Sequence, residues 1–334
     1  MNIHSLEKGA YLITDNEKNI LIDGVPAEYT GEYLKSIEKI IPLDKIDAVI
    51  YNNASPDNVG CLEGLLEKNN NITVFASTAG LRNITEIINR EFRQAVCKNK
   101  GTYEKLTFYL IPGVPWPDSM ITYYAEEKIL FSGALFSGNG SENLTGSNRM
   151  YMKTVIEAVS GIDVNSIYSC SGIKNGVFEI IENYKLSAQD VQYDYDVAVV
   201  YASSFGYTKM MAEKLYDTAV GRGYKAVLIN AESETVDTEK CKSIALGVNT
   251  TDRNMPDSIW RFLSKLKVSD VAGKYYFVFG SSGWSGEGVL IADKILSELR
   301  MRRFDKPLEV TFNPTEADFE KASDYILRLM EKVI

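Results

Sequence analysis

Apolar residues in the first half of the chain form short runs separated by polar turns. Such runs are typical of β-strands, while two longer stretches, residues 32 to 40 and 84 to 96, carry the spacing of amphipathic helices. The pattern predicts a mixed α/β domain between residue 10 and about residue 180. The predicted strands read AYLI, NILIDG, IDAVIY, ITVFAS, LTFYLIP, KILFSG and NSIYS.

The second half of the chain has a more regular pattern. The polar segment KLSAQDVQYDYD ends the first pattern, and DVAVVYASS then opens a strongly apolar strand. The strands AVLIN, SIALGVN, KYYFVFGSS and LEVTF follow, with helices predicted over residues 209 to 222, 257 to 266 and 289 to 302. Strands that alternate with such helices predict a parallel sheet covered on both faces. We therefore expect two domains, residues 1–190 and 194–334.

Composition excludes several classes of protein. The chain has 334 residues, of which 45% are hydrophobic, so it can build two cores. No apolar run approaches the roughly 18 to 20 residues of a membrane span, and the first twenty residues do not resemble a signal peptide. The net charge of −9 argues against nucleic acid as a partner. Four widely spaced cysteines indicate buried thiols. We expect a cytoplasmic protein that binds neither membrane nor nucleic acid.

The first chemical signal is the loop after the strand VAVVY. A good helix, KMMAEKLYDTAV, follows it at once. Backbone N–H groups at a helix start point outward, and the helix dipole favours an anion there, so the loop suits a phosphate. Plain capping of a helix is the alternative. The loop contains no lysine, so it is not a P-loop for nucleotide triphosphates. Its candidate residues are Ser203, Ser204, Phe205, Gly206, Tyr207 and Thr208.

Two further loops follow strands of the same predicted sheet. Ligands of open parallel sheets bind outside the carboxyl ends of the strands, where the strand order reverses. All three loops are expected at that edge, and a tryptophan in the last one could cover a flat aromatic ligand. The candidate residues are Asn249, Thr250, Thr251 and Asp252 in the middle loop, and Ser281, Ser282, Gly283, Trp284, Ser285 and Gly286 in the third loop.

These segments resemble the flavodoxin domain of flavodiiron proteins, also called A-type flavoproteins. FGSSGWSGEGV matches that family's third loop almost letter for letter, and SSFGYTKMMA matches its phosphate loop. GVNTTDRNMP is a looser match to its middle loop, which usually reads more like SPTYNN. The resemblance implies an FMN cofactor. Its phosphate would lie on residues 203 to 208, and its isoalloxazine ring between the middle and third loops, near Trp284.

The N-terminal half resembles, in shortened form, the metallo-β-lactamase-like αββα domain of the same family. The match runs through IDAVIYNNASPDNVGCLEGLL, VPWPDSM and EEKILFSGALFSG. In the family, the first segment carries the motif H-x-E-x-D-H. A histidine precedes the Trp-Pro-Asp-Ser segment, an aspartate follows the ILFS strand, and a last histidine lies near the end of the domain. These residues hold a diiron centre.

The corresponding positions in this chain carry different chemistry. The histidine, glutamate and second histidine of the motif are replaced, and only Asp57 keeps its carboxylate. His4 is the only histidine of the sequence, so a two-metal site built on several imidazoles cannot form. We expect no metal site but a hydrogen-bonded polar cluster, with weak binding of Mg²⁺ or Ca²⁺ as the alternative. The replacing residues are Asn53, Ser55, Asn58, Pro115, Ala134 and Ser171.

Two further features of the N-terminal half bear on this pocket. Asp118 and Ser119 are interpreted as turn residues of the scaffold. Cys61 and Cys170 fall near the former metal site, but no basic residue nearby would activate their thiols.

The resemblance to flavodiiron proteins frames the functional hypotheses. Intact members reduce oxygen or nitric oxide at the diiron centre, with FMN passing electrons across a head-to-tail dimer. We expect this chain to be an FMN-binding electron-transfer protein or FMN-dependent oxidoreductase, and neither a diiron reductase nor a metallohydrolase. Its partner would be a redox protein that acts as electron donor or acceptor, and it would form the family's head-to-tail homodimer. The alternative is a non-catalytic regulatory protein that uses the degenerate domain as a dimer or partner surface.

Overall fold

The chain folds into two compact units that divide near residue 190. The computed structural model describes all residues except 1, 7 and 8, 15 to 17, 138 to 146, 189 to 191, 236 and 284. Each unit has its own sheets and its own apolar cores. No helix among the described residues is long and apolar enough to cross a membrane.

The first unit is a sandwich of two six-stranded sheets. The first sheet has the order β1-β2-β3-β4-β5-β6 and the second the order β12-β11-β10-β9-β8-β7. The strands of the first sheet are β1 (Asn2–Ser5), β2 (Tyr11–Thr14), β3 (Asn19–Ile22), β4 (Ala48–Ile50), β5 (Thr73–Ala76) and β6 (Arg93–Val96). Those of the second are β7 (Thr102–Tyr103), β8 (Leu106–Leu110), β9 (Met120–Tyr124), β10 (Ile129–Gly133), β11 (Ser166–Ser169) and β12 (Gly172–Lys174).

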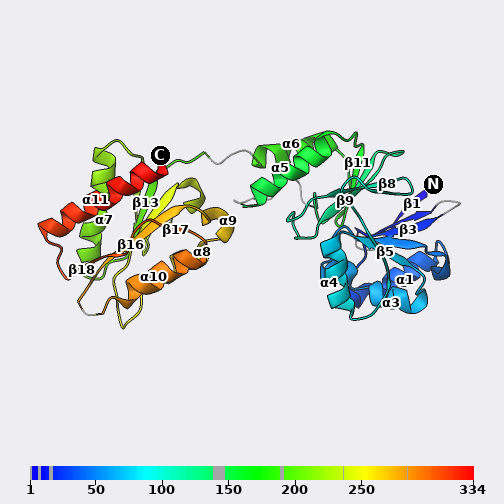
Figure 1. Cartoon of the computed structure of the whole chain (residues 1–334), viewed down its shortest axis with the longest axis horizontal. Helices are drawn as coiled ribbons and strands as arrows, with labels where there is room; N and C mark the ends of the chain where they lie inside the picture. Colours follow the sequence, from blue (N-terminus) through cyan, green and yellow to red (C-terminus); the bar gives the residue numbers. More distant parts are fainter. Residues whose placement is uncertain are drawn as a thin grey trace. The chain divides into compact units, whose positions relative to one another are not determined.

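Helices cover the outer face of each sheet, which gives four layers (Figure 1). The helices are α1 (Thr30–Glu38), α2 (Pro56–Val59), α3 (Leu62–Lys68), α4 (Thr78–Ile88), α5 (Ser147–Ser160) and α6 (Val177–Ser187). Side chains from α1, α3 and α4 pack on the first sheet, and side chains from α5 and α6 pack on the second. A third core, which includes Ile22, Ile50 and Phe131, lies between the sheets. Strands with both faces covered read as continuous apolar runs, as the sequence does here.

One predicted helix of this unit is wrong in its second half. The stretch from 84 to 96 was expected to be helical, but α4 ends at Ile88 and residues 93 to 96 form β6. Asn89 takes a left-handed conformation with φ of 51°, which terminates the helix, and β6 then pairs in parallel with β5. Tertiary pairing outweighs the local helical spacing at this position.

The second unit is a doubly wound parallel sheet. Its order is β14-β13-β15-β16, and both β17 and β18 pair with β16. The strands are β13 (Val197–Tyr201), β14 (Ala226–Asn230), β15 (Ser243–Gly247), β16 (Tyr275–Ser282), β17 (Arg302–Arg303) and β18 (Leu308–Thr311). The strand order reverses between β13 and β15, which is where ligands of such sheets bind.

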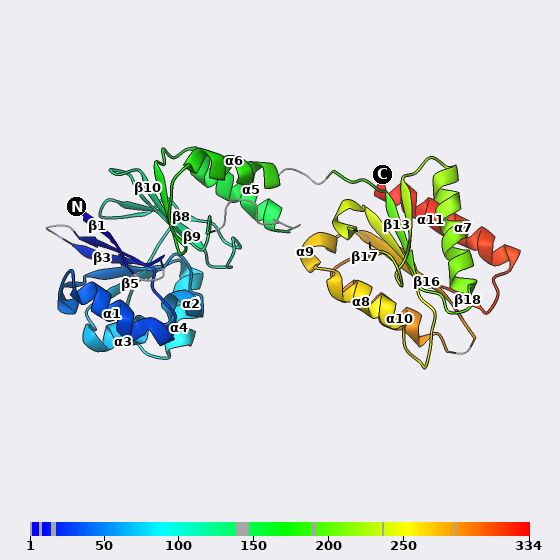
Figure 2. The same ribbon diagram turned by 180° about the vertical axis from the view of Figure 1, so that it is seen from behind.

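Helices cover both faces of this sheet (Figure 2). The helices are α7 (Tyr207–Gly221), α8 (Asp257–Lys265), α9 (Val268–Val271), α10 (Glu287–Glu298) and α11 (Glu316–Val333). Residues of α7 and α11 pack on one face, and residues of α8 and α10 on the other. The sequence did not predict α11, although Thr315 and Asp318 form a capping box at its start. The predicted fold class, an αββα domain followed by a doubly wound parallel sheet, is confirmed.

Candidate functional site

The three loops predicted for FMN meet at one edge of the second unit, and hydrogen bonds join each to another. Asn249 Nδ2 donates to Ser204 Oγ at 2.9 Å, which links the middle loop to the phosphate loop. The N–H of Ser281 donates to Thr208 Oγ1 at 3.4 Å, and that of Gly288 to Thr250 Oγ1 at 3.1 Å. The loops therefore form one connected surface.

The phosphate loop leaves the start of α7 open. The N-cap residue of this helix is Gly206, in a left-handed conformation with φ of 84°, and as a glycine it has no side chain with which to cap the helix. A β-carbon at Gly206 would meet nothing within 4 Å, so free space lies beside the helix start. Phe205 is 87% exposed, whereas Thr208 is buried. A 15-residue helix with an open first turn is a suitable place for a phosphate group.

The middle loop contains a tight turn that the sequence did not predict. Thr251 and Asn254 exchange two backbone hydrogen bonds of 2.9 Å, and the two residues between them both have positive φ, 50° for Asp252 and 57° for Arg253. Non-glycine residues rarely adopt this conformation, and it gathers at functional sites. Trp260 Nε1 donates to Asn254 Oδ1 at 3.2 Å and holds the turn against α8.

The middle loop also holds a buried amide with an unused acceptor. Asn249 is 8% exposed, and its Oδ1 has no hydrogen-bond partner among the described residues. An unpaired buried acceptor beside the phosphate loop is consistent with a site that a ligand completes.

The third loop follows β16, and two of its glycines lie in close contact with side chains at and beyond β18. A β-carbon at Gly283 would overlap the ring of Phe312, and one at Gly286 would overlap the carboxylate of Glu309. Ser285 Oγ donates to Glu287 Oε2 at 2.5 Å, and Ser282 lies at the end of β16. Trp284 lies outside the described residues.

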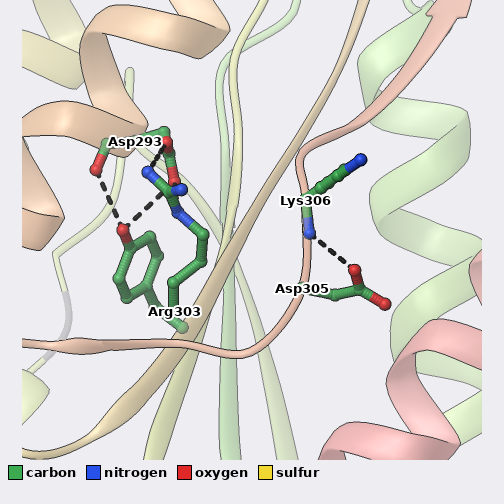
Figure 3. Close-up of polar contacts among 5 residues, drawn as sticks. Asp293, Arg303, Asp305 and Lys306 are labelled. Atoms are coloured by element: carbon green, nitrogen blue, oxygen red, sulfur yellow. Dashed lines mark hydrogen bonds and ion pairs between the residues drawn. The ribbon is translucent and has the colours of Figure 1, made fainter.

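Helix α10, which starts at the third loop, is anchored at its middle by a buried carboxylate (Figure 3). Asp293 is 6% exposed and accepts from Arg303 Nε at 2.8 Å and from Tyr276 Oη at 3.1 Å. Arg303 Nη2 also contacts Asp293 Oδ2. These bonds join α10 to β16 and β17, so the helix start is held in place relative to the sheet.

In the first unit, Asn53, Ser55 and Asn58 are all buried on the segment that follows β4. Asn58 Nδ2 donates to the carbonyl of Asn53 at 2.8 Å, and Asn58 Oδ1 accepts from the N–H of Gly24 at 2.8 Å. Asn53 Oδ1 accepts from the N–H of Ser55 at 3.1 Å. Asp57 has its side chain exposed on α2. The amides of this segment are thus engaged in hydrogen bonds within the protein.

Asp23 lies at the centre of this network, and the sequence analysis did not single it out. Its carboxylate accepts three bonds of 2.8 Å, from the N–H and the Nδ2 of Asn52 and from Asn58 Nδ2. Burial raises the pKa of Asp23 above its ordinary 3.8, and the hydrogen bonds from Asn58 and Asn52 oppose this rise. The signal for it was the NILIDG segment, in which an aspartate with φ of 59° ends an apolar strand.

The remaining positions of the expected metal pocket lie on other loops. Pro115 and Ser171 are exposed, and Ala134 is half-buried. Gly133 brings two of these loops together, because its carbonyl accepts from the N–H of Cys170 at 2.8 Å, while a β-carbon at Gly133 would lie 3.0 Å from Asn52 Cβ and 3.4 Å from Asn53 Nδ2. Ser171 Oγ donates to the carbonyl of Ser137 at 2.7 Å.

Asp118 does more than shape a turn. It is 3% exposed, and its Oδ2 accepts from the N–H of Ala54 at 2.7 Å, while its carbonyl accepts from Ser77 Oγ at 2.8 Å. It therefore ties the Trp-Pro-Asp-Ser loop to the segment after β4. Ser119 Oγ accepts from the N–H of Trp116 at 3.1 Å within the loop. Burial raises the pKa of the Cys61 thiol to about 11, so this cysteine is not an activated nucleophile.

Comparisons with known proteins match both units. Residues 6–187 match the ODP family beta lactamase model, and residues 199–325 match the flavodoxin model. The flavo-diiron protein FprA2 of Clostridium acetobutylicum is 29% identical, over 94% of this chain and 88% of its own length.

Solved structures share the fold over nearly the whole chain. The rubredoxin oxygen:oxidoreductase of Desulfovibrio gigas aligns with a TM-score of 0.63 and 23% identity, over 97% of this chain and 90% of its own. The flavodiiron protein of Giardia intestinalis aligns with a TM-score of 0.61 and 24% identity, over the same shares of the two chains.

Proposed function

The chain belongs to the flavodiiron protein family, and on this premise we propose that it is an FMN-binding electron-transfer protein that works without a diiron centre. The observation that carries the proposal is the contrast in hydrogen bonding between two sites. The start of α7 is open and joined to two further loops, whereas the donors around Asp23 and Asn58 in the first unit are paired by the protein's own groups.

The residues at the edge of the second unit fit FMN. The first turn of α7, with Ser203, Ser204 and Thr208 around it, would hold the phosphate group. The middle loop, from Asn249 to Asp252, and the third loop, from Ser281 to Gly286, would flank the isoalloxazine ring. Bound FMN supplies reversible electron transfer, and the protein sets its potential and limits its access to water.

The donor set of the first unit does not fit a diiron centre. Iron in this family would need imidazole and carboxylate ligands, and the sequence has one histidine, on β1. Asn58 Nδ2 points its hydrogens at Asp23 and at the carbonyl of Asn53, so this nitrogen cannot donate a lone pair to a metal. We derive no catalytic step from iron in this chain.

Without iron in the chain, electrons from FMN must pass to another molecule. The partner is a redox protein that serves as donor or acceptor, in line with relatives such as the rubredoxin-oxygen oxidoreductase of Megalodesulfovibrio gigas, which is 25% identical. We propose the head-to-tail homodimer of the family as the assembly in solution.

A reconstitution experiment tests the flavin site. Titration of flavin-free protein with FMN, followed by quenching of flavin fluorescence, should saturate at one FMN per chain. Thr208→Val should weaken binding about tenfold, because a hydroxyl near the phosphate is worth roughly 1.4 kcal/mol, and Thr208→Ser should restore it. Reduced protein should then reduce cytochrome c. Absence of saturable FMN binding would contradict the proposal, and binding without electron transfer would favour a regulatory role.

A further inference from the structure

The end of β18 lies directly beside the start of the third loop. β18 pairs in parallel with the end of β16, in a register that sets Ser282 opposite Thr311. Beyond the strand, the N–H of Phe312 donates to the carbonyl of Ser282 at 3.1 Å, and Ser281 Oγ donates to the carbonyl of Phe312 at 2.6 Å. The third loop therefore starts from a backbone that β18 and Phe312 fix.

Phe312 packs against the third loop in an unusual conformation. Its φ is 55°, which is unfavourable for a residue with a bulky side chain by roughly 1 to 2 kcal/mol. Its ring fills the space that a β-carbon at Gly283 would occupy, yet the residue is 58% exposed. Phe312 thus adopts a strained backbone conformation and packs its ring against one glycine of the third loop. We interpret this contact as one that sets the path of the loop.

Glu309 contacts the other glycine of the loop. Side chains alternate along a strand, so Leu308 and Val310 enter the core with α7 and α11 while Glu309 faces the opposite side of the sheet. Its carboxylate fills the space at Gly286, the left-handed N-cap residue of α10. Glu309 is an exposed residue, and the partial burial of its carboxyl raises its pKa above the ordinary 4.5. The positive end of the α10 dipole favours a carboxylate at this place.

We propose that Glu309 and Phe312 are positioning residues of the FMN site. Phe312 fixes the third loop through Gly283, and Glu309 places a negative charge under the loop at Gly286. This inference rests on the FMN binding proposed above. A carboxylate near the flavin opposes the gain of negative charge on reduction, so Glu309 lowers the reduction potential.

Glu298 provides a matched control for the charge. It is exposed at the last position of α10, roughly 18 Å along the helix from Gly286 at a rise of about 1.5 Å per residue. Glu309→Gln removes one negative charge beside the start of α10, and Glu298→Gln removes one at its end. Redox titration should give a higher midpoint potential for Glu309→Gln and an unchanged one for Glu298→Gln, while Glu309→Asp should stay near wild type. Equal potentials for Glu309→Gln and Glu298→Gln would overturn the role of Glu309.

Phe312 is tested through loop placement and FMN affinity. Phe312→Ala should weaken FMN binding at least fivefold, and Phe312→Tyr, which keeps the ring, should bind within twofold of wild type. In flavin-free protein, Phe312→Ala should speed hydrogen exchange at the amides of Ser281 and Gly288, which donate to Thr208 Oγ1 and Thr250 Oγ1, with the far-ultraviolet circular dichroism spectrum unchanged. Unchanged exchange or wild-type affinity would overturn the role of Phe312.

The exchange measurement separates the two proposals. If the wild-type protein binds no FMN, both the proposed function and the redox role of Glu309 are contradicted. The exchange rates would still show whether Phe312 fixes the third loop.

Discussion

The polar network around Asp23 in the first unit and the loop edge of the second unit differ in how their hydrogen-bonding groups are satisfied. Around Asp23, three donors converge on one buried carboxylate, and Asn58 uses both ends of its amide within the protein. At the start of α7, no side chain caps the helix, and Asn249 Oδ1 lacks a partner among the described residues. The network around Asp23 needs no ligand to pair its donors, and Asp118 Oδ1 is an unpaired acceptor near it among the described residues. At the loop edge, both an open helix start and an unpaired amide oxygen are available to a ligand.

The largest expected effect comes from removing the Asp23 carboxylate, the common acceptor of the polar network. Asp23→Ala leaves three buried donors without an acceptor, and each such donor costs roughly 1 to 3 kcal/mol, so the first unit should lose about 3 kcal/mol of stability or more. Native-state hydrogen exchange follows each unit separately and measures this loss. Asp57→Ala, at the exposed carboxylate of α2, should change stability by less than about 0.5 kcal/mol. Equal losses of stability in the two variants would show that the hydrogen bonds to Asp23 do not stabilise the first unit.

FMN should stabilise the second unit and leave the first unit unchanged. A ligand that binds only the folded state adds about 2.7 kcal/mol at a free concentration one hundred times its Kd. Hydrogen exchange with and without FMN should show slower exchange in β13, β15 and β16 and unchanged exchange in β3 and β4. Protection of both units to the same extent would remove the contrast between them.

Asp293 tests how far the loop edge depends on an anchor beneath it. Asp293→Ala removes the acceptor of Arg303 and Tyr276, and it should destabilise the second unit by about 2 kcal/mol, since Arg303 remains half exposed to water. Urea denaturation measures the change. The matched variant Asp324→Ala breaks the exposed pair with Arg328 and should cost less than about 0.5 kcal/mol. A loss at Asp293 as small as that at Asp324 would be inconsistent with an anchoring role.

The smallest effect concerns the protonation of Asp23. Burial raises the pKa of this carboxyl more than its hydrogen bonds lower it, so the folded state holds the proton more tightly than the unfolded state. Its contribution to stability is therefore fully present below about pH 3.8, the ordinary value, and is lost as the pH rises through the folded pKa. Carbon NMR titration of the Asp23 carboxyl should give a midpoint above 3.8. A midpoint below it would mean that the three donors outweigh burial.

The strand pattern was sufficient to predict the loop edge. Parallel strands bring their carboxyl ends to one edge, so Ser204, Asn249 and Ser281 could be grouped from the order of strands and helices alone. The hydrogen bonds that join these loops agree with that expectation. Which of the loop residues contact FMN stays a prediction.

Long-range contacts were beyond the reach of the sequence pattern. Asp23 receives its donors from Asn52 and Asn58, about thirty residues away, and nothing in the local pattern shows this. Phe312 and Glu309 looked like ordinary strand residues, and only their contacts with Gly283 and Gly286 show a role. The failure at β6 has the same cause, because pairing with β5 overrides a helical spacing.

Metal analysis by mass spectrometry, combined with the visible spectrum of the protein as isolated, shows whether this member of the flavodiiron family binds FMN and works without iron. We expect a flavin spectrum, one FMN released per chain on denaturation, and iron far below one atom per chain. Two iron atoms per chain, or a protein that gains no flavin spectrum with added FMN, would show that the proposed function is wrong.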